Sequence, residues 1–424
     1  MKHNIFRGDT IDLRSILRAR TGSTIFLVAN LLVFAILSLI QMRFTVKYCG
    51  LIPWSTVALG GLAGGFAQNL IDRGFSISGS AVINESGARN YWSVALLSLR
   101  TKSKYVPFAL LGGCSYAYVL PQTERTLFLF TFVSSMCLGF SLDWVFVGLD
   151  SPRSIFIVST VPKFISSFLG IVGIYIFKQI YFVPYSLFFY AVANLALGLL
   201  VLKSSREKAL YFELNKLDIV KITRSVWSRI TADLYWILPG MLVVIFSPTL
   251  GLTFLVVDRV VKFFVAPSIG ATQALGSYLI INVKSAILRI RISFFFHAIT
   301  ATVISLAGIF AVPFAVTFLS NNTITLSYLE VCFLSLYIFF VVLSRSFTFH
   351  YYYLSEMSLV PAVVNILSII VFSFFISFDL VSTLLGVIAL TAFIQFFSFA
   401  VYYIIFAAKR STRESISLFD IANP

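Results

Sequence analysis

The stretch from residue 251 to 281 is an apolar run long enough to cross a bilayer, and it carries Asp258, Arg259 and Lys262. On a helix that begins near residue 251, these charges lie roughly 10–16 Å deep, toward the midplane of a ~30 Å hydrocarbon core. Each such charge costs about 2.5–3.5 kcal/mol at the helix centre, whereas each surrounding apolar residue contributes only about 0.3–0.6 kcal/mol. Charges at this depth face a bundle interior or a water-filled cavity. We therefore predict that this helix forms one wall of a cationic cavity.

The spacing of these three charges leaves two interpretations open. Arg259 and Lys262 are three residues apart and share a helix face, whereas Asp258 and Lys262 are four apart and are able to pair. A self-neutralising structural triad is one interpretation, but it leaves Arg259 as a surplus cation, and an unpaired buried arginine is costly. We favour contact with a substrate for Arg259 and Lys262.

Four further charged residues lie inside predicted spans. Lys163 is about nine residues from the cytoplasmic start of its span, so a cavity-facing side chain is favoured over one that snorkels to the surface. Asp143, Asp233 and Glu330 are the other intramembrane carboxylates. Together with Asp258, they are candidates for proton or cation coupling or for gating, a role that suits membrane carboxylates. Solvation at a helix end or a local ion pair is the alternative for each.

The composition identifies a polytopic membrane protein. Hydrophobic residues make up 59% of the 424 residues, charged residues only 12%, and the mean hydropathy is +0.94. Four scattered cysteines and three histidines without paired spacing predict no disulfide framework, metal site or cofactor. The chain has no phosphate-binding glycine loop, HExxH or GxSxG motif and no long outer loop, so we expect a protein that is not an enzyme.

Hydropathy predicts an all-α protein of about twelve transmembrane helices in two six-helix lobes around the cationic cavity. The third span is the least defined, because its apolar core is short. The predicted spans are 22–42, 51–71, 104–120, 126–147, 154–176, 180–202, 230–248, 251–281, 293–317, 326–345, 359–378 and 381–407.

The distribution of Lys and Arg predicts the orientation in the membrane. The segments on one side of these spans, counted with the flanking Lys104 and Arg345, hold 25 of the 32 cations, and the opposite loops hold 4. Cytoplasmic loops carry the excess of cations, so both termini are predicted in the cytoplasm of a cell inner membrane. This bias also accounts for most of the net charge of +15 without a nucleic-acid partner.

The one long polar connection divides the spans six and six. We therefore predict an N-terminal lobe over 1–203, a cytoplasmic linker over 204–229, and a C-terminal lobe over 230–424 with a short cytoplasmic tail. Equal halves joined by a linker are typical of transporters whose lobes are related by an axis along the membrane normal. In the second span, the spacing of Gly60, Gly61, Gly64 and Gly65 favours close helix packing.

Two stretches resemble the polysaccharide flippases (Wzx type) of the multidrug/oligosaccharidyl-lipid/polysaccharide exporter superfamily. At the end of the fourth span the chain reads Asp143-Trp144-Val145-Phe146-Val147-Gly148-Leu149-Asp150. This is similar to the family's D-W-x-F-Q-G-L-E, with Val147 replacing Gln and Asp150 replacing Glu. After the second span, Asp72-Arg73-Gly74-Phe75-Ser76 is similar to a D-F-G-L stretch, with Arg73 replacing an aromatic residue. Span number, topology and the charged eighth helix extend the resemblance loosely over almost the whole chain.

The resemblance implies a V-shaped pair of six-helix lobes and a lipid-linked oligosaccharide substrate. This isoprenoid-diphosphate-linked repeat unit of an O-antigen, capsule or exopolysaccharide passes from the cytoplasmic to the outer leaflet. Arg matches phosphate oxygens bidentately, so Arg259, Lys262 and Lys163 are the candidate substrate-binding residues. Membrane lipids and other polysaccharide-assembly proteins are the implied partners. A cation-coupled multidrug exporter of the same superfamily is the alternative function, and a membrane glycan polymerase or ligase is a weaker one.

The predicted topology is testable with reporter fusions. Fusions placed after Ser204 and after Lys409 should both report a cytoplasmic location, because the flanking segments are rich in Lys and Arg. Paired cytoplasmic and periplasmic reporters at each position provide the control. A periplasmic signal at either position would contradict the twelve-span arrangement.

Overall fold

The computed structural model describes residues 33–72, 74, 75, 79, 91–149, 151–204, 226–282, 286–348 and 359–421. Helices, with short turns between them, make up these described ranges. Of the predicted first span, residues 22–32 lie outside the described residues, and so does most of the linker over 204–229. The all-helical fold class that hydropathy predicts is confirmed.

The N-terminal half of the chain begins with a helix over residues 33–49. It continues with α2 (Leu51–Asp72), α4 (Tyr91–Ser103), α5 (Val106–Val119), α6 (Gln122–Met136), α7 (Asp143–Gly148), α8 (Pro152–Ile155), α9 (Val161–Phe177) and α10 (Phe182–Ser204). The C-terminal half contains α12 (Val226–Phe246), α13 (Pro248–Asn282), α14 (Ala286–Leu319), α15 (Tyr328–Phe347), α16 (Leu359–Ser377) and α17 (Leu384–Ile421).

Seven helical stretches of the described residues are long and apolar enough to cross a membrane, which identifies a multi-pass membrane protein. They contain α6, α9, α10, α14, α15, α16 and α17. Neither α2 nor α13 is among them, and these two helices contact each other between the two halves of the chain. The less apolar helices therefore lie at the centre, where protein rather than lipid surrounds them.

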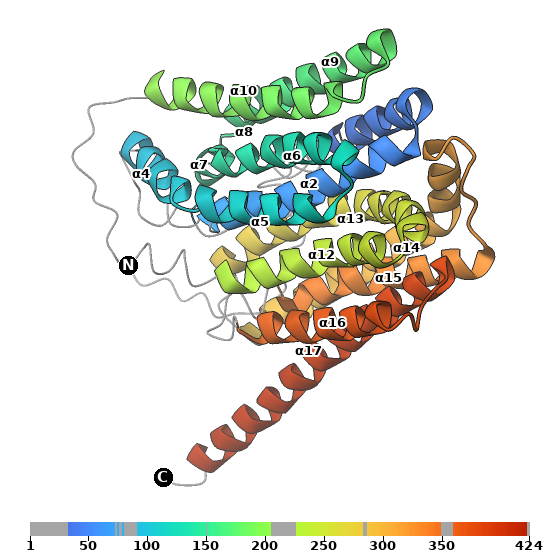
Figure 1. Ribbon diagram of the computed structural model, residues 1–424. Coiled ribbons are helices and arrows are strands. Elements are labelled where there is room, and N and C mark those ends of the chain that lie inside the picture. The colour runs from blue at the N-terminus through green and yellow to red at the C-terminus, as the bar shows by residue number, and fades with distance from the viewer. Residues whose placement is uncertain are drawn as a thin grey trace.

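Several predicted spans differ from the observed helices in ways that the sequence explains. The segment before the third span forms its own helix, α4, and a turn at Lys104 and Tyr105 separates it from α5, which begins with Pro107 in its first turn. The fourth span ends in a 3-10 turn over Cys137–Phe140 before α7 begins. The fifth span enters through a π-helical turn over Phe156–Thr160. The last helix, α17, runs to residue 421, beyond the predicted end at 407, and projects from the bundle (Figure 1).

Helix packing lies mainly within each half of the chain. In the first half, α2 packs on α6 and α9 packs on α10, whereas in the second half α14 packs on α15 and α12 on α16. Figure 1 shows the two groups of helices beside each other. Contact between them runs through α2, which lies against α12 and α13. The lobe boundaries at 203 and 230 remain a prediction.

Two of the four glycines of α2 bring its backbone against α6. A Cβ atom added at Gly60 would lie 2.8 Å from the Phe128 carbonyl oxygen, and one at Gly64 would lie 2.5 Å from the Ser135 Cβ. A Cβ at Gly61 or Gly65 would meet nothing within 4 Å. Close packing is therefore a property of the Gly60–Gly64 face, whereas the Gly61–Gly65 face of α2 is open.

The two halves also meet at one end of the bundle. The guanidinium of Arg43 donates a hydrogen bond to the backbone carbonyl of Phe318, at the end of α14, and lies 4.6 Å from the centre of the Phe318 ring. Met42 and Val316 belong to the same buried apolar cluster. In the predicted topology this is the outer end, so the halves are joined on the outer side.

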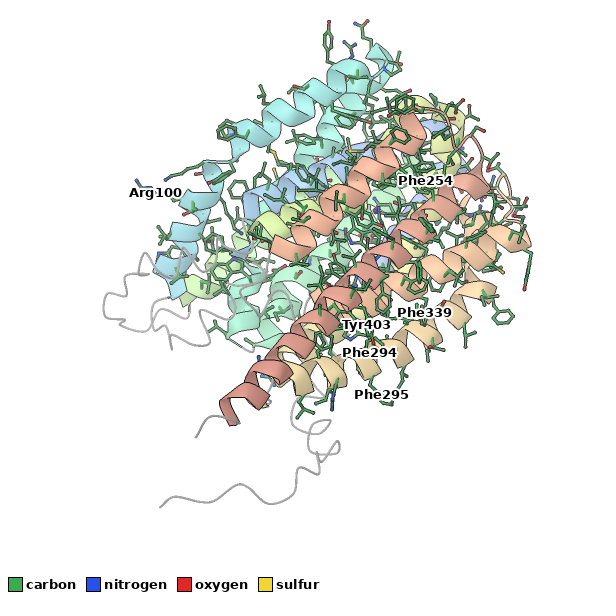
Figure 2. The ribbon with its side chains drawn as sticks, turned by 90° about the horizontal axis from the view of Figure 1, so that it is seen from below. Arg100, Phe254, Phe294, Phe295, Phe339 and Tyr403 are labelled. Carbon is green, nitrogen blue, oxygen red and sulfur yellow. The ribbon has the colours of Figure 1, made fainter. Side chains whose placement is uncertain are left out.

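Aromatic side chains cover the outside of the bundle. Phe295 of α14 projects from its surface and is 69% exposed, with Phe294 beside it (Figure 2). Phe310 and Phe314, further along the same helix, are also exposed. A surface of this kind suits lipid rather than water, because exposed apolar patches of this extent mark a membrane or a partner. The inner faces of the helices are left to carry the polar groups.

The two glycine faces of α2 provide a matched test of packing. Gly64→Ala should lower the thermal stability of the purified protein, because overpacking costs about 1–3 kcal/mol. Gly65→Ala should leave it unchanged or raise it, since Ala stabilises a helix by up to about 1 kcal/mol relative to Gly. Melting temperatures of both variants in one detergent give the comparison. Equal destabilisation by the two substitutions would contradict the observed packing.

Candidate functional site

Two cations from opposite halves of the chain lie near each other. Lys163 is in the first turn of α9 and Arg259 is near the middle of α13, and their charges are close enough to interact. The Arg259 side chain is exposed and has no hydrogen bond or ion pair with the described residues. The Lys163 ammonium lies 5.0 Å from the centre of the Tyr190 ring and has no carboxylate partner there. Because the two side chains approach from different halves, they face the space between these halves.

Lys262, in contrast, is paired on its own helix. Its ammonium lies 2.5 Å from the carboxylate of Asp258 and donates a hydrogen bond of 3.0 Å to the carbonyl oxygen of Trp236 on α12. Pro239 helps to supply this acceptor, because a proline inside a helix removes one backbone hydrogen bond and opens the preceding turn. The geometry thus favours the structural interpretation for Asp258 and Lys262, and leaves Arg259 as the surplus cation.

Asp143 is held by hydrogen bonds from two neighbouring elements. The Ser159 hydroxyl donates to one carboxylate oxygen at 3.1 Å, and the Asn194 amide donates to the other at 3.0 Å. The Ser159 hydroxyl also lies 3.2 Å from the Tyr190 hydroxyl, and the Tyr190 ring lies beneath Lys163. A continuous polar path therefore joins the Asp143 carboxylate to the cation that faces Arg259.

The π-helical turn before α9 positions one end of this path. Pro162 has no N–H group, so the carbonyl of Val158, four residues earlier, has no helical partner. The Asn194 amide donates to that carbonyl at 3.1 Å while it also donates to Asp143. The Asn194 carbonyl oxygen is buried and accepts no hydrogen bond from the described residues. Ser159, Tyr190 and Asn194 are thus functional candidates that sequence reasoning missed, although Pro162 was a visible signal of the irregular turn.

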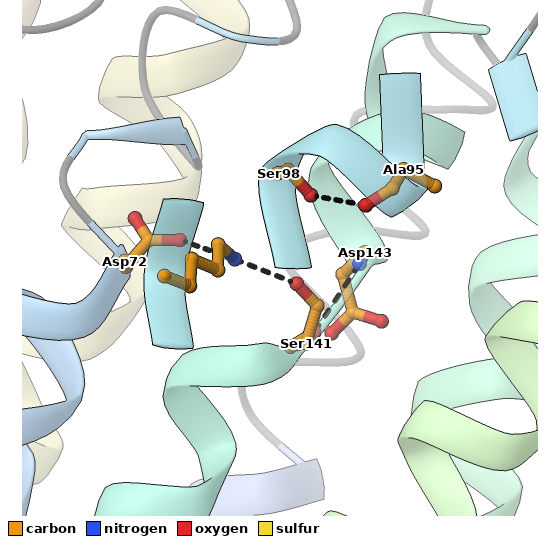
Figure 3. A network of polar contacts seen from close by, with 6 residues as sticks. Asp72, Ala95, Ser98, Ser141 and Asp143 are labelled. Carbon is orange, nitrogen blue, oxygen red and sulfur yellow. Dashed lines mark hydrogen bonds and ion pairs between the residues drawn. The ribbon is translucent and has the colours of Figure 1, made fainter. Parts of the chain in front are cut away.

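A buried ion pair lies beside this network and was not predicted. The Lys102 ammonium is fully buried, 3.0 Å from the Asp72 carboxylate, and it donates to the Ser141 carbonyl at 3.1 Å (Figure 3). The backbone N–H of Asp143 donates to the Ser141 hydroxyl at 3.2 Å. The charge of Lys102 also acts electrostatically on Asp143. Lys102 therefore connects two carboxylates that are far apart in sequence.

The two stretches that carry the family resemblance meet in space at this point. The ring of Phe75, from the stretch that begins at Asp72, lies 5.2 Å from the ring of Trp144, which follows Asp143. A Cβ atom at Gly79 would lie 2.7 Å from the Trp144 ring, so only glycine allows this approach. The two motifs together form one structural unit around Lys102.

The remaining candidate residues have other surroundings. The carboxylate of Glu330 accepts hydrogen bonds from the backbone N–H and the hydroxyl of Ser327, at 2.7 and 2.9 Å, and so caps α15. This geometry favours a structural role over coupling. Asp233 lies in α12, and its side chain is outside the described part of the structure.

Comparison with known proteins places the fold. No family model matches the chain, and no curated protein matches it by sequence. Solved structures do match over nearly the whole chain. The Vibrio cholerae MATE transporter VcmN shares 14% identity with a TM-score of 0.54 and covers 95% of this chain and 98% of its own. The lipid II flippase MurJ, in an inward closed conformation, shares 16% identity with a TM-score of 0.51, over 91% and 87% of the two chains.

A third similar structure is described by its charge. It is a MOP superfamily transporter from Pyrococcus furiosus, in which reverse polarity of the binding pocket suggests a different function. It shares 13% identity with a TM-score of 0.50 and covers 95% of this chain and 99% of its own. At these identities the likeness concerns the fold alone. The chain therefore has the helical architecture of the MATE and MurJ membrane transporters.

The Asp72–Lys102 pair provides a test by double substitution. Lys102→Met should destabilise the protein by about 3–5 kcal/mol, because it leaves a buried carboxylate without its partner. Adding Asp72→Asn should restore much of that loss, since the second change removes the stranded charge. The readout is the melting temperature of the purified variants together with their abundance in the membrane. Additive losses in the double variant would show that the two charges do not depend on each other.

Proposed function

We propose that this protein is a flippase that moves an isoprenoid-diphosphate-linked oligosaccharide from the cytoplasmic to the outer leaflet by alternating access. The observation that carries the proposal is the approach of Lys163 and Arg259 from the two halves of the chain. The substrate would be a repeat unit of an O-antigen, capsule or exopolysaccharide, and the protein would reside in the cell inner membrane with both termini cytoplasmic.

The charges of this site fit a diphosphate. Two cations that lack carboxylate partners in the described structure repel each other, and an anion between them would relieve that repulsion. The planar guanidinium of Arg259 matches phosphate oxygens in pairs, whereas the Lys163 ammonium acts as a point charge. Lys262 contributes indirectly, because its ion pair with Asp258 positions the adjacent Arg259 on α13.

The packing of the two halves fits alternating access. At the predicted outer end the halves are joined by Arg43 and Phe318, and α2 lies against α12 and α13. The Gly61–Gly65 face of α2 offers an open surface without side chains, which a bulky lipid-linked sugar requires. Release of the outer contact would then open the cavity toward the outer leaflet.

Asp143 is the candidate for coupling this movement to a proton. Its hydrogen-bonded path through Ser159 and Tyr190 reaches Lys163, so a change in its protonation would alter the site that holds the substrate. Membrane carboxylates in such paths are typical of proton relays. Asp233 remains a second candidate.

A cation-coupled multidrug exporter is the rival function. Two of the similar structures are titled as multidrug transporters with TM-scores of 0.54 or less, so the fold allows either function. A cavity for cationic drugs requires carboxylates, whereas Asp258 is neutralised by Lys262 and the groups left over here are cations. The sign of the central charge therefore favours an anionic substrate.

The test compares binding of an isoprenyl diphosphate by purified variants. Arg259→Ala should weaken binding about 10–100-fold, because it removes a charge-assisted contact worth about 1.5–3 kcal/mol. Arg259→Lys should retain part of the affinity, since it keeps the charge but loses the paired geometry. Lys163→Ala should also weaken binding.

Arg291→Ala is the matched control, because Arg291 is an exposed arginine near the start of α14. Its affinity should equal that of the parent protein. Flipping in proteoliposomes, normalised to the amount of protein, gives the second readout. Unchanged binding and flipping by Arg259→Ala would overturn the proposed function.

A further inference from the structure

A second polar cavity lies within the C-terminal half of the chain, apart from the space between the halves. Its volume is ≈ 140 Å³, far above the ~10–15 Å³ that a single water needs. It is enclosed by α12, α15, α16 and α17, and its polar lining includes Arg345, Ser344, Asn365, Gln395 and Ser398. A cavity of this polarity requires contents that satisfy hydrogen bonds.

Two of these lining residues have donors without partners. The Arg345 guanidinium has no hydrogen bond or ion pair with the described residues. The amide of Asn365, which is 9% exposed, likewise has none there. Together the two side chains offer a positive charge and several N–H groups to the same space, and none of the residues that line the cavity is acidic.

The other polar groups of the cavity are engaged with each other. The Tyr235 hydroxyl donates to the Gln395 carbonyl oxygen at 2.8 Å, and the Gln395 amide donates to the Ser344 hydroxyl at 3.1 Å. The Ser398 hydroxyl lies 3.0 Å from that of Ser368. These bonds fix the wall of the cavity and leave the donors of Arg345 and Asn365 directed at whatever fills it.

From this arrangement we propose that the cavity is a binding site for a small soluble anion of chloride or acetate size. A guanidinium in a low-dielectric interior is stabilised by an anion that accepts its hydrogen bonds. Arg345 and Thr348 are only half-buried, so the cavity reaches the surface near the end of α15. The volume excludes an oligosaccharide, which separates this site from the proposed substrate site.

The site is also placed to influence the centre of the molecule. Tyr235 and Trp236 line this cavity and also a smaller one that contains Asp258. Tyr337, in the wall of the smaller cavity, interacts electrostatically with both Asp258 and Arg345. An anion at Arg345 therefore changes the field at the Asp258–Lys262 pair, which lies beside Arg259.

The experiment measures the melting temperature of the purified full chain in sodium chloride, sodium acetate and sodium gluconate at equal ionic strength, without any isoprenyl lipid. Chloride or acetate should raise the melting temperature in a saturable manner relative to gluconate, which is too large for the cavity. Arg345→Gln should weaken this dependence about 10–100-fold in apparent affinity, as should Arg345→Lys in part. Asn365→Ala should weaken it while preserving the charge.

Arg291→Gln is the matched control and should keep the full anion response, because Arg291 is an exposed arginine outside the cavity. An anion response equal in Arg345→Gln and in the parent would overturn the proposal. A uniform loss of stability in all three salts would also overturn it, since Arg345 would then act only on the helix end. Stabilisation by phosphatidylglycerol bicelles, but by neither small anion, would assign the cavity to a lipid phosphate instead.

Discussion

Charge pairing inside an apolar helix bundle is the constraint on which this structure depends. The chain has 32 Lys and Arg against 17 Asp and Glu, so cations in the interior compete for few carboxylates. Lys102 and Lys262 each obtain one, and each also donates to a backbone carbonyl. Lys163, Arg259 and Arg345 obtain none within the described residues. Because an uncompensated buried charge is unstable, these three side chains mark the places where water or an anionic ligand must enter.

Prolines create polar contact points in helices that are otherwise apolar. Pro162 frees the Val158 carbonyl for Asn194, and Pro239 opens α12 next to the Trp236 carbonyl that accepts from Lys262. In both cases the helix gains an acceptor without an added charge, which costs less in a low-dielectric interior than another carboxylate would. The irregular turns thereby hold polar side chains in place beside the candidate site.

Local properties were predictable from the sequence, whereas contacts between distant segments were not. Hydropathy located the apolar helices, and the spacing of Asp258 and Lys262 allowed their pair, because both depend on residues within one helix. Lys102 was counted as a loop cation and Arg345 as a flanking one. Only the packing of α4 on the turn at Ser141, and of α15 among its neighbours, encloses them. Ser159, Tyr190 and Asn194 are common residue types without a diagnostic spacing, so only the fold reveals their connection to Asp143.

The sign of the central charges links binding to movement. Lys163 and Arg259 lie on different halves, so their repulsion opposes approach of the halves when the space between them is empty. A diphosphate that contacts both would reverse this effect and favour a closed arrangement. A ligand shifts such an equilibrium only through its different affinity for the two arrangements, and a cation at this site would make no favourable contact in either. On the proposed function, the same two residues therefore select an anionic substrate and make the transition of the empty protein unfavourable.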